Sequence, residues 1–319
     1  LEGKGGKGAA LTERLVNFFL VVEALAQDAL RRTVQDLAEA YEWLAKEGII
    51  EREWKGEGSD VQYLPMRPIV HGGDDLVFVC AGRIGFAVLT RYLYYWEALS
   101  AGYMENGFGE PRALTAGGGL YIMPAKFPFS RGHEMAQHLY TSAKNARRAW
   151  KRAHSAGAEA GSWLDFQIVL EGLILPLRQL REHYYRSADG NRLWLRPYAA
   201  SGEGTPTYEE LLDRVHALRP HEDDRRAWPR SHSKALMEEL AAGKTASEKF
   251  VRSVGSRGYG LPGPLWLEET NANGETSDAA GPGHVTPWFD AAEILDFYCE
   301  IPWGRYGEQE IGEEAMQDV

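Results

Sequence analysis

Two aspartates, Asp74 and Asp75, directly follow two glycines, Gly72 and Gly73, in the run HGGDDLVFV. Carboxylates are hard oxygen ligands of the kind that Mg²⁺ and Mn²⁺ prefer. Glycine reaches positive φ at little steric cost, and its missing side chain lets a phosphate or a base approach the backbone closely. One interpretation of the run is therefore a nucleotide site, with Asp74 and Asp75 as catalytic metal ligands and Gly72 and Gly73 beside the nucleotide.

The same four residues also fit an ordinary type I′ turn with solvated acids. Side chains alternate along a strand, so two adjacent aspartates point to opposite faces unless the turn twists them. The GGDD run by itself leaves both interpretations open.

The runs on either side predict how this turn is held. Two apolar stretches indicate strands over 61–71 and 74–80, joined at Gly72–Gly73 as a hairpin with a two-residue turn. From Leu11, apolar residues recur at alternating steps of four and three, which predicts a long amphipathic helix with Gly48 as its stop.

Thr12 is expected to lie near the start of that helix. The preceding run, LEGKGGKGAA, has no side chain that could anchor a core and is expected to be a flexible lead. It lacks the spacing of a phosphate-binding P-loop.

A second group of candidate residues follows the hairpin. A strand is expected over 112–124, and its centre has no side chains because it consists of Gly117, Gly118 and Gly119. These glycines are expected to give a nucleotide room. Lys144, in the next helix, is expected to neutralise phosphate charge.

The remaining elements are predicted by periodicity and by turn residues. Helices are expected over about 83–102, 130–153 (capped by Ser130), 207–218 (capped by Thr207), 232–241, 245–254 and 289–298, and further extended runs over 162–170 and 193–198. The order through residue 170 is helix, strand, strand, helix, strand, helix, strand. One more strand in front would give the split β-α-β-β-α-β unit of the ferredoxin-like fold.

The predicted fold class is therefore α+β. A ferredoxin-like nucleotide cyclase or palm domain is expected over 1–175 with its first strand missing, then a mostly helical domain over 176–300 and a disordered acidic tail over 301–319. The chain of 319 residues carries a formal net charge of −11, so a nucleotide must meet a local positive patch or a bridging cation.

Cys80 and Cys299 are the only cysteines, which is too few for a disulfide framework or a CxxC zinc site. Together with the lack of an apolar run of roughly 18 residues, they predict a cytoplasmic protein without a membrane span.

These runs resemble the second palm domain of the large subunit of type III CRISPR effector complexes. The matching runs are LTERLVNFF, HGGDDLVFV, TAGGGLYIMPAKFPF, the helix through SAKNARR, and WLDFQIVLEG, over about residues 11–175. GGDD is the specific element, and the others support it by order and spacing. The resemblance implies that two Mg²⁺ or Mn²⁺ ions promote nucleotidyl transfer on ATP to make cyclic oligoadenylates for antiviral defence. It also implies other effector subunits and guide and target RNA as partners.

The sequence departs from that family in several places. A strand with further aspartates, a nuclease domain, zinc-binding cysteines and a first palm domain are absent, and His71 stands where a small residue is usual. The chain is therefore expected to be an N-terminally incomplete or a diverged relative. The alternatives are a non-catalytic nucleotide-binding or scaffold subunit, and a relative of the diguanylate cyclases, which share the fold and have a GG[DE]EF loop.

Two further candidates each keep two interpretations, and one more run is assigned to the surface. KNARRAWKRAH, residues 144–154, fits a solvated helix face or a triphosphate contact by Lys144 with Arg147 or Arg148 nearby. Asp165 fits a polar position of the resembled family or an acid at a strand edge. HEDD, residues 221–224, is expected to be surface.

Overall fold

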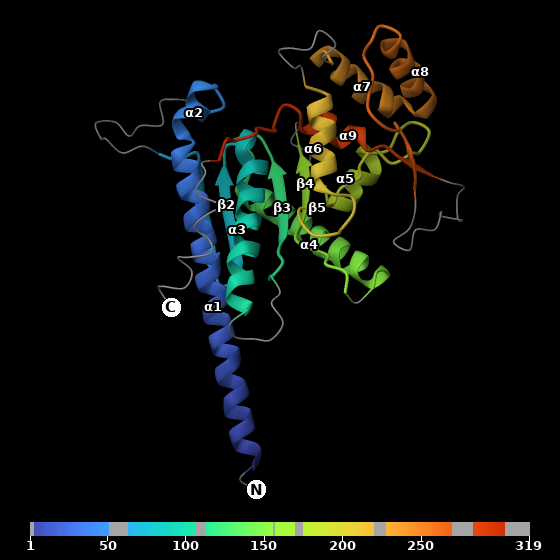
Figure 1. Ribbon diagram of the computed structural model, residues 1–319. Coiled ribbons are helices and arrows are strands. Elements are labelled where there is room, and N and C mark those ends of the chain that lie inside the picture. Colours follow the sequence, from blue (N-terminus) through green and yellow to red (C-terminus); the bar gives the residue numbers. More distant parts are fainter. Residues whose placement is uncertain are drawn as a thin grey trace. The chain divides into compact units, whose positions relative to one another are not determined.

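The computed structural model describes residues 3–50, 63–105, 113–155, 157–169, 175–219, 228–269 and 283–303, and gives only the backbone of 3–11 and 102–105. Over these ranges the chain is an α+β protein that divides into two compact units, one of residues 1–115 with 299–319 and one of residues 116–298 (Figure 1). The boundary at residue 175 that the sequence predicts is not where the chain divides. The reason is that β3, α4 and β4 share contacts with the elements that follow them.

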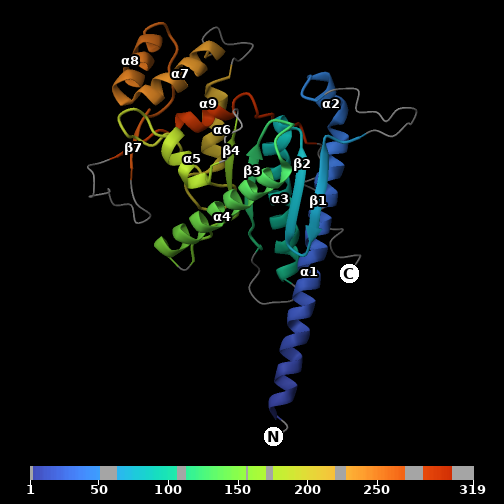
Figure 2. The same cartoon turned by 180° about the vertical axis from the view of Figure 1, so that it is seen from behind.

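The first unit packs two long helices against a β-hairpin (Figures 1 and 2). Its elements are α1 (Gly3–Glu39), α2 (Tyr41–Lys46), β1 (Met66–Gly72), β2 (Asp75–Cys80), a single 3₁₀ turn (Gly82–Ile84) and α3 (Gly85–Glu105). Leu37, Leu44 and Val88 are fully buried in its core. Cys299 and Ile301 join this core, so the predicted acidic tail does not begin at residue 301.

The first helix differs from its prediction at both ends. It begins at Gly3, where a flexible lead was expected, and not near Thr12. Helix propagation is cooperative, because each added residue contributes one more hydrogen bond to a helix that has already formed. The helix ends at Glu39, and α2 then continues the pattern to the Gly48 stop, which has a φ of +65°.

The N-terminal half of α1 extends beyond α3 (Figures 1 and 2). Four large apolar side chains there, Leu15, Val16, Phe19 and Leu20, are exposed. Burial begins two residues after Leu20, at Val22.

The second unit is built on a three-stranded mixed sheet. β3 (Gly117–Ile122) pairs in parallel with β4 (Trp163–Ile168), and β4 pairs antiparallel with β5 (Tyr198–Ala199). All six residues of β4 are buried. The other elements are α4 (Phe129–Ala153), α5 (Leu177–Tyr184), α6 (Tyr208–Ala217), α7 (Arg230–Ala242), α8 (Lys244–Gly255), β6 (Leu267–Glu268), β7 (His284–Val285) and α9 (Trp288–Ile294).

Two predicted helix caps have different outcomes. Thr207 caps α6 as predicted: its side chain accepts from the backbone N–H of Glu210, whose side chain accepts in return from the Thr207 N–H. Ser130 does not cap α4. The helix begins one residue earlier, at Phe129, with Pro128 at the N-cap position.

The sheets that the structure describes are a two-stranded hairpin in the first unit and the three-stranded sheet and a small β6–β7 pair in the second. The α+β class is thus confirmed, whereas the ferredoxin-like palm stays a prediction. The HEDD run lies outside the described residues.

Close packing of α4 on β3 explains one of the three glycines. A Cβ atom added to Gly119 would lie 2.3 Å from the carbonyl oxygen of Ala136 and 2.6 Å from the backbone nitrogen of Tyr140. Real Cβ atoms do not approach backbone so closely, so the strand and helix can lie at this distance only with glycine at this position.

We expect Gly119→Ala to destabilise the second unit by about 1–3 kcal/mol, because the added methyl group must push α4 away from β3. Gly255→Ala at the end of α8 is the control, since nothing lies within 4 Å of a Cβ there. Urea unfolding followed by circular dichroism measures both. Equal midpoints for Gly119→Ala and wild type would contradict the packing role.

Candidate functional site

The turn of the hairpin consists of Gly73 and Asp74, not of Gly72 and Gly73. Gly72 pairs with Asp75 in the strand register, which leaves two residues between them. Gly73 has a φ of +60°, and no described non-glycine residue has a positive φ. A type I′ turn needs positive φ at both central residues, whereas type II′ needs it only at the first. The turn therefore follows the type II′ pattern, and its first residue needs glycine.

Asp74 and Asp75 are both exposed, and they leave the hairpin on different sides. Leu76 packs against the cluster formed by α1 and α3, so alternation places Asp75 on the opposite face of the hairpin. Burial raises the pKa of Tyr92 in α3, and the charge of Asp74 raises it further. Asp74 thus lies on the side of α3. The carboxylates diverge in this structure.

The backbone at the tip of the hairpin is open. A Cβ atom added to Gly72 or to Gly73 would have nothing within 4 Å. A phosphate or a sugar can therefore approach the backbone at Gly72 and Gly73, on the side where a Cβ atom would lie, without displacing a side chain.

The donor chemistry of this turn fits one kind of metal site. Among the described residues, no three histidine, cysteine, aspartate or glutamate side chains gather to hold an ion. Mg²⁺, however, usually keeps several waters and is bound by one or two carboxylates together with substrate phosphates. Two exposed carboxylates beside an open backbone fit that mode, with Asp74 and Asp75 as the protein ligands.

The other candidate residues lie in the second unit. Gly117 and Gly119 face α4, and a Cβ on Gly117 would lie 2.9 Å from Cγ of Lys144. Gly118 is buried. Gly117 and Gly119 thus have a packing role, which the sequence pattern did not separate from space for a nucleotide.

Lys144 is half-buried beside the start of β3. Its Nζ lies 2.6 Å from the Tyr140 hydroxyl and 4.6 Å from the centre of the Tyr140 ring. No described carboxylate forms an ion pair with Lys144, so its charge is available to an anion. Tyr140 was missed in the sequence, although its i,i−4 spacing from Lys144 places both on one helix face.

The rest of the basic run divides between surface and structure. Arg147 donates to the backbone carbonyl of Gly161 at 2.9 Å, which ties α4 to the segment before β4. Arg148, Lys151 and Arg152 are exposed on the same helix. The solvated-face interpretation therefore describes this end of α4.

Asp165 is structural and does not lie at a strand edge. It occupies the central strand β4, is fully buried, and receives both terminal nitrogens of Arg181 at 2.6 and 3.1 Å. Arg181 belongs to α5, a helix that the sequence pattern did not predict. Its pairing with Asp165 therefore became visible only in the folded unit.

A second buried cation was also missed in the sequence. The Arg196 guanidinium lies 2.8 Å from Glu293 and 4.3 Å from the centre of the Phe166 ring. Burial raises the pKa of Glu293, and the charge of Arg196 opposes that shift. Asp290 accepts from the backbone N–H groups of Leu195 and Arg196. These groups join α9 to the sheet.

Two comparisons with known proteins were informative. No protein-family model matches this chain, and no curated protein is significantly similar to it. None of the helices within the described ranges is long and apolar enough to cross a membrane.

We expect Arg181→Met to destabilise the second unit by about 3–5 kcal/mol, because it leaves the buried Asp165 carboxylate without a cation. The double variant Asp165→Asn, Arg181→Met should recover part of that loss, since the uncompensated charge is gone. Urea unfolding of the single and double variants makes the comparison. Single and double variants of equal stability would contradict the pairing.

Proposed function

We propose that this chain binds ATP with Mg²⁺ or Mn²⁺ and transfers nucleotidyl groups. The observation that carries the proposal is the tip of the hairpin, where two exposed carboxylates stand beside a backbone that no side chain covers. A metal-bound phosphate needs both features, because the carboxylates attract the cation and the uncovered backbone gives the phosphate room.

The proposal gives each element one role. Asp74 and Asp75 each offer a carboxylate to a divalent cation, and Gly72 and Gly73, which carry no side chain, lie beside the nucleotide. Lys144, in the second unit, neutralises the charge of a phosphate bound beside it, since it forms no ion pair with a described carboxylate. In the reaction a ribose hydroxyl attacks the α-phosphate of an ATP, one P–O bond forms, and pyrophosphate leaves. When bound, divalent ions would neutralise charge on the reacting phosphates.

The fold and the product belong to the same proposal. The order of elements, from α1 through the hairpin, α3, β3 and α4, supports a ferredoxin-like palm. The resemblance to the second palm domain of type III CRISPR effector large subunits supports cyclic oligoadenylates as the product. We therefore propose an antiviral defence complex with other effector subunits and RNA as the setting.

The second candidate is a non-catalytic nucleotide-binding or scaffold subunit. It is favoured by the divergence of Asp74 and Asp75, because a pair of ions needs more carboxylates than these two. A relative of the diguanylate cyclases is the third candidate, and a preference for GTP over ATP would identify it.

We expect the protein to convert radiolabelled ATP to oligoadenylates in Mn²⁺ and RNA, and Asp74→Asn, Asp75→Asn to remove the product. Amide side chains keep the shape of the turn and lose the charge that holds the cation. Thin-layer separation of the products measures this. A control reaction of wild type contains EDTA, which should also abolish the product because it removes the Mn²⁺.

Two other outcomes of this assay are informative. Wild type that binds ATP and forms no product, with or without RNA, would favour the scaffold candidate. Equal product from wild type and the double variant would contradict the role of the hairpin.

We also expect Lys144→Met to weaken ATP binding by about tenfold to a hundredfold, because it removes a charged hydrogen-bond donor to phosphate. Lys151→Met is the matched control, since it removes the same charge from an exposed position of the same helix. Isothermal calorimetry with Mg²⁺ and ATP compares them. Equal losses of ATP affinity in the two variants would show that the effect comes from the general charge of α4 and not from Lys144 itself.

A further inference from the structure

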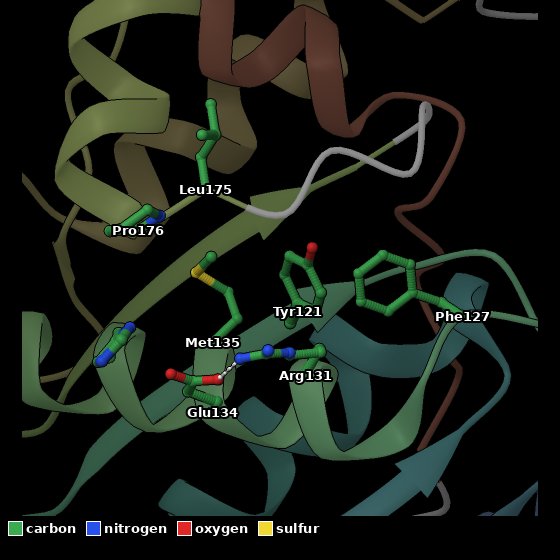
Figure 3. Close-up of a pocket in the computed structure, with 8 residues that line it drawn as sticks. Tyr121, Phe127, Arg131, Glu134, Met135, Leu175 and Pro176 are labelled. Carbon is green, nitrogen blue, oxygen red and sulfur yellow. Dashed lines mark hydrogen bonds and ion pairs between the residues drawn. The ribbon is translucent and has the colours of Figure 1, made fainter.

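A pocket of about 280 Å³ opens between the end of β3, the first turns of α4 and the start of α5. Figure 3 shows Phe127, Tyr121 and Met135 across its centre. Leu175 and Pro176 lie on the α5 side. All of these residues belong to the second unit. This volume is just below the roughly 300–1,000 Å³ of ordinary ligand pockets, which suits a small flat ring.

The walls are aromatic and apolar. The Tyr121 and Phe127 rings meet edge to face, with their centres 6.0 Å apart. Met135 is buried, and its thioether reaches the pocket (Figure 3). Burial also raises the pKa of the Tyr121 phenol, which therefore stays a neutral hydrogen-bond donor. Aromatic faces with a polarisable sulfur favour a flat ring as ligand.

The charges at the rim select against ions. Arg131 pairs with Glu134 at 3.0 Å, so the two side chains neutralise each other. A phosphate finds no uncompensated cation there, and a metal ion finds no free carboxylate. His138 and the Tyr121 hydroxyl offer hydrogen bonds to the edge of an uncharged ring.

The position of the pocket in the fold is one where ligands bind. β3 and β4 are parallel, and Tyr121 lies near the carboxyl end of β3. In α/β sheets, ligands commonly bind beyond the carboxyl ends of parallel strands. Met135 and Lys144 are nine residues apart on α4, or about 13 Å along the helix. The pocket is thus separate from a phosphate bound at Lys144.

We propose that this pocket binds the base of a nucleoside, an uncharged planar heterocycle of purine size that stacks on the Phe127 ring and meets Tyr121 at its edge. The site goes beyond the proposed nucleotidyl transfer and does not depend on the hairpin. It needs neither a metal ion nor a phosphate, so a free nucleoside is the suitable probe.

The test is titration of the full chain with adenosine, monitored by saturation-transfer NMR and calorimetry, with ribose as the probe without a base. We expect adenosine to bind and ribose not to bind. Phe127→Ala should weaken the binding of adenosine by about tenfold or more, because each aromatic–base stack contributes strongly to binding. Phe129→Ala is the control, since this nearby phenylalanine is exposed and does not line the pocket.

A second variant separates loss of the binding site from loss of folding. Leu175→Trp fills the pocket and should abolish adenosine binding while circular dichroism stays unchanged. Asp74→Asn, Asp75→Asn should bind adenosine as wild type does, which separates this site from the hairpin. Absence of adenosine binding to wild type, or equal affinity in Phe127→Ala and Phe129→Ala, would overturn the pocket proposal and leave the hairpin proposal to its own assay.

Discussion

Gly119 of β3 lies so close to α4 that a methyl group there would meet the Ala136 carbonyl oxygen at 2.3 Å. This contact sets the height of the helix over the strand. Lys144 of the same helix lies beside the start of β3. Met135, also of α4, lines the pocket near the end of β3. A shift of α4 would therefore move both the phosphate-binding candidate and the pocket.

Aspartates serve two different purposes in this chain. Asp36, Asp165 and Asp290 are buried, and each lies beside an arginine, namely Arg91, Arg181 and Arg196. Buried charges are tolerated in this way because a cation and hydrogen bonds replace water. Asp74 and Asp75 are exposed and form no ion pair with a described residue. Their carboxylates are therefore available to a ligand, which is the physical basis of the proposed function.

Much of the local structure could be predicted from the sequence. The hairpin, α3, α4, β4 and the capped α6 follow from periodicity and from residues a few positions apart. The position of the turn could not, because GGDD fits either pair of central residues until the strand register is known.

Long-range pairing accounts for most of the other differences. Asp165 and Arg181 are 16 residues apart, and Asp290 accepts from Tyr198 across 92 residues. No local pattern marks such partners. The pocket was missed for the same reason, since Tyr121, Met135 and Leu175 come from three separate segments that only the folded unit brings together.

Direct detection of metal binding at the hairpin is the most direct test of the central claim. Electron paramagnetic resonance of free Mn²⁺, titrated with the protein in the presence of ATP, counts the ions that become bound. The account predicts that wild type depletes the free Mn²⁺ signal and that Asp74→Ala, Asp75→Ala leaves only the depletion due to ATP itself. Equal depletion by the two proteins would show that these carboxylates do not hold the cation.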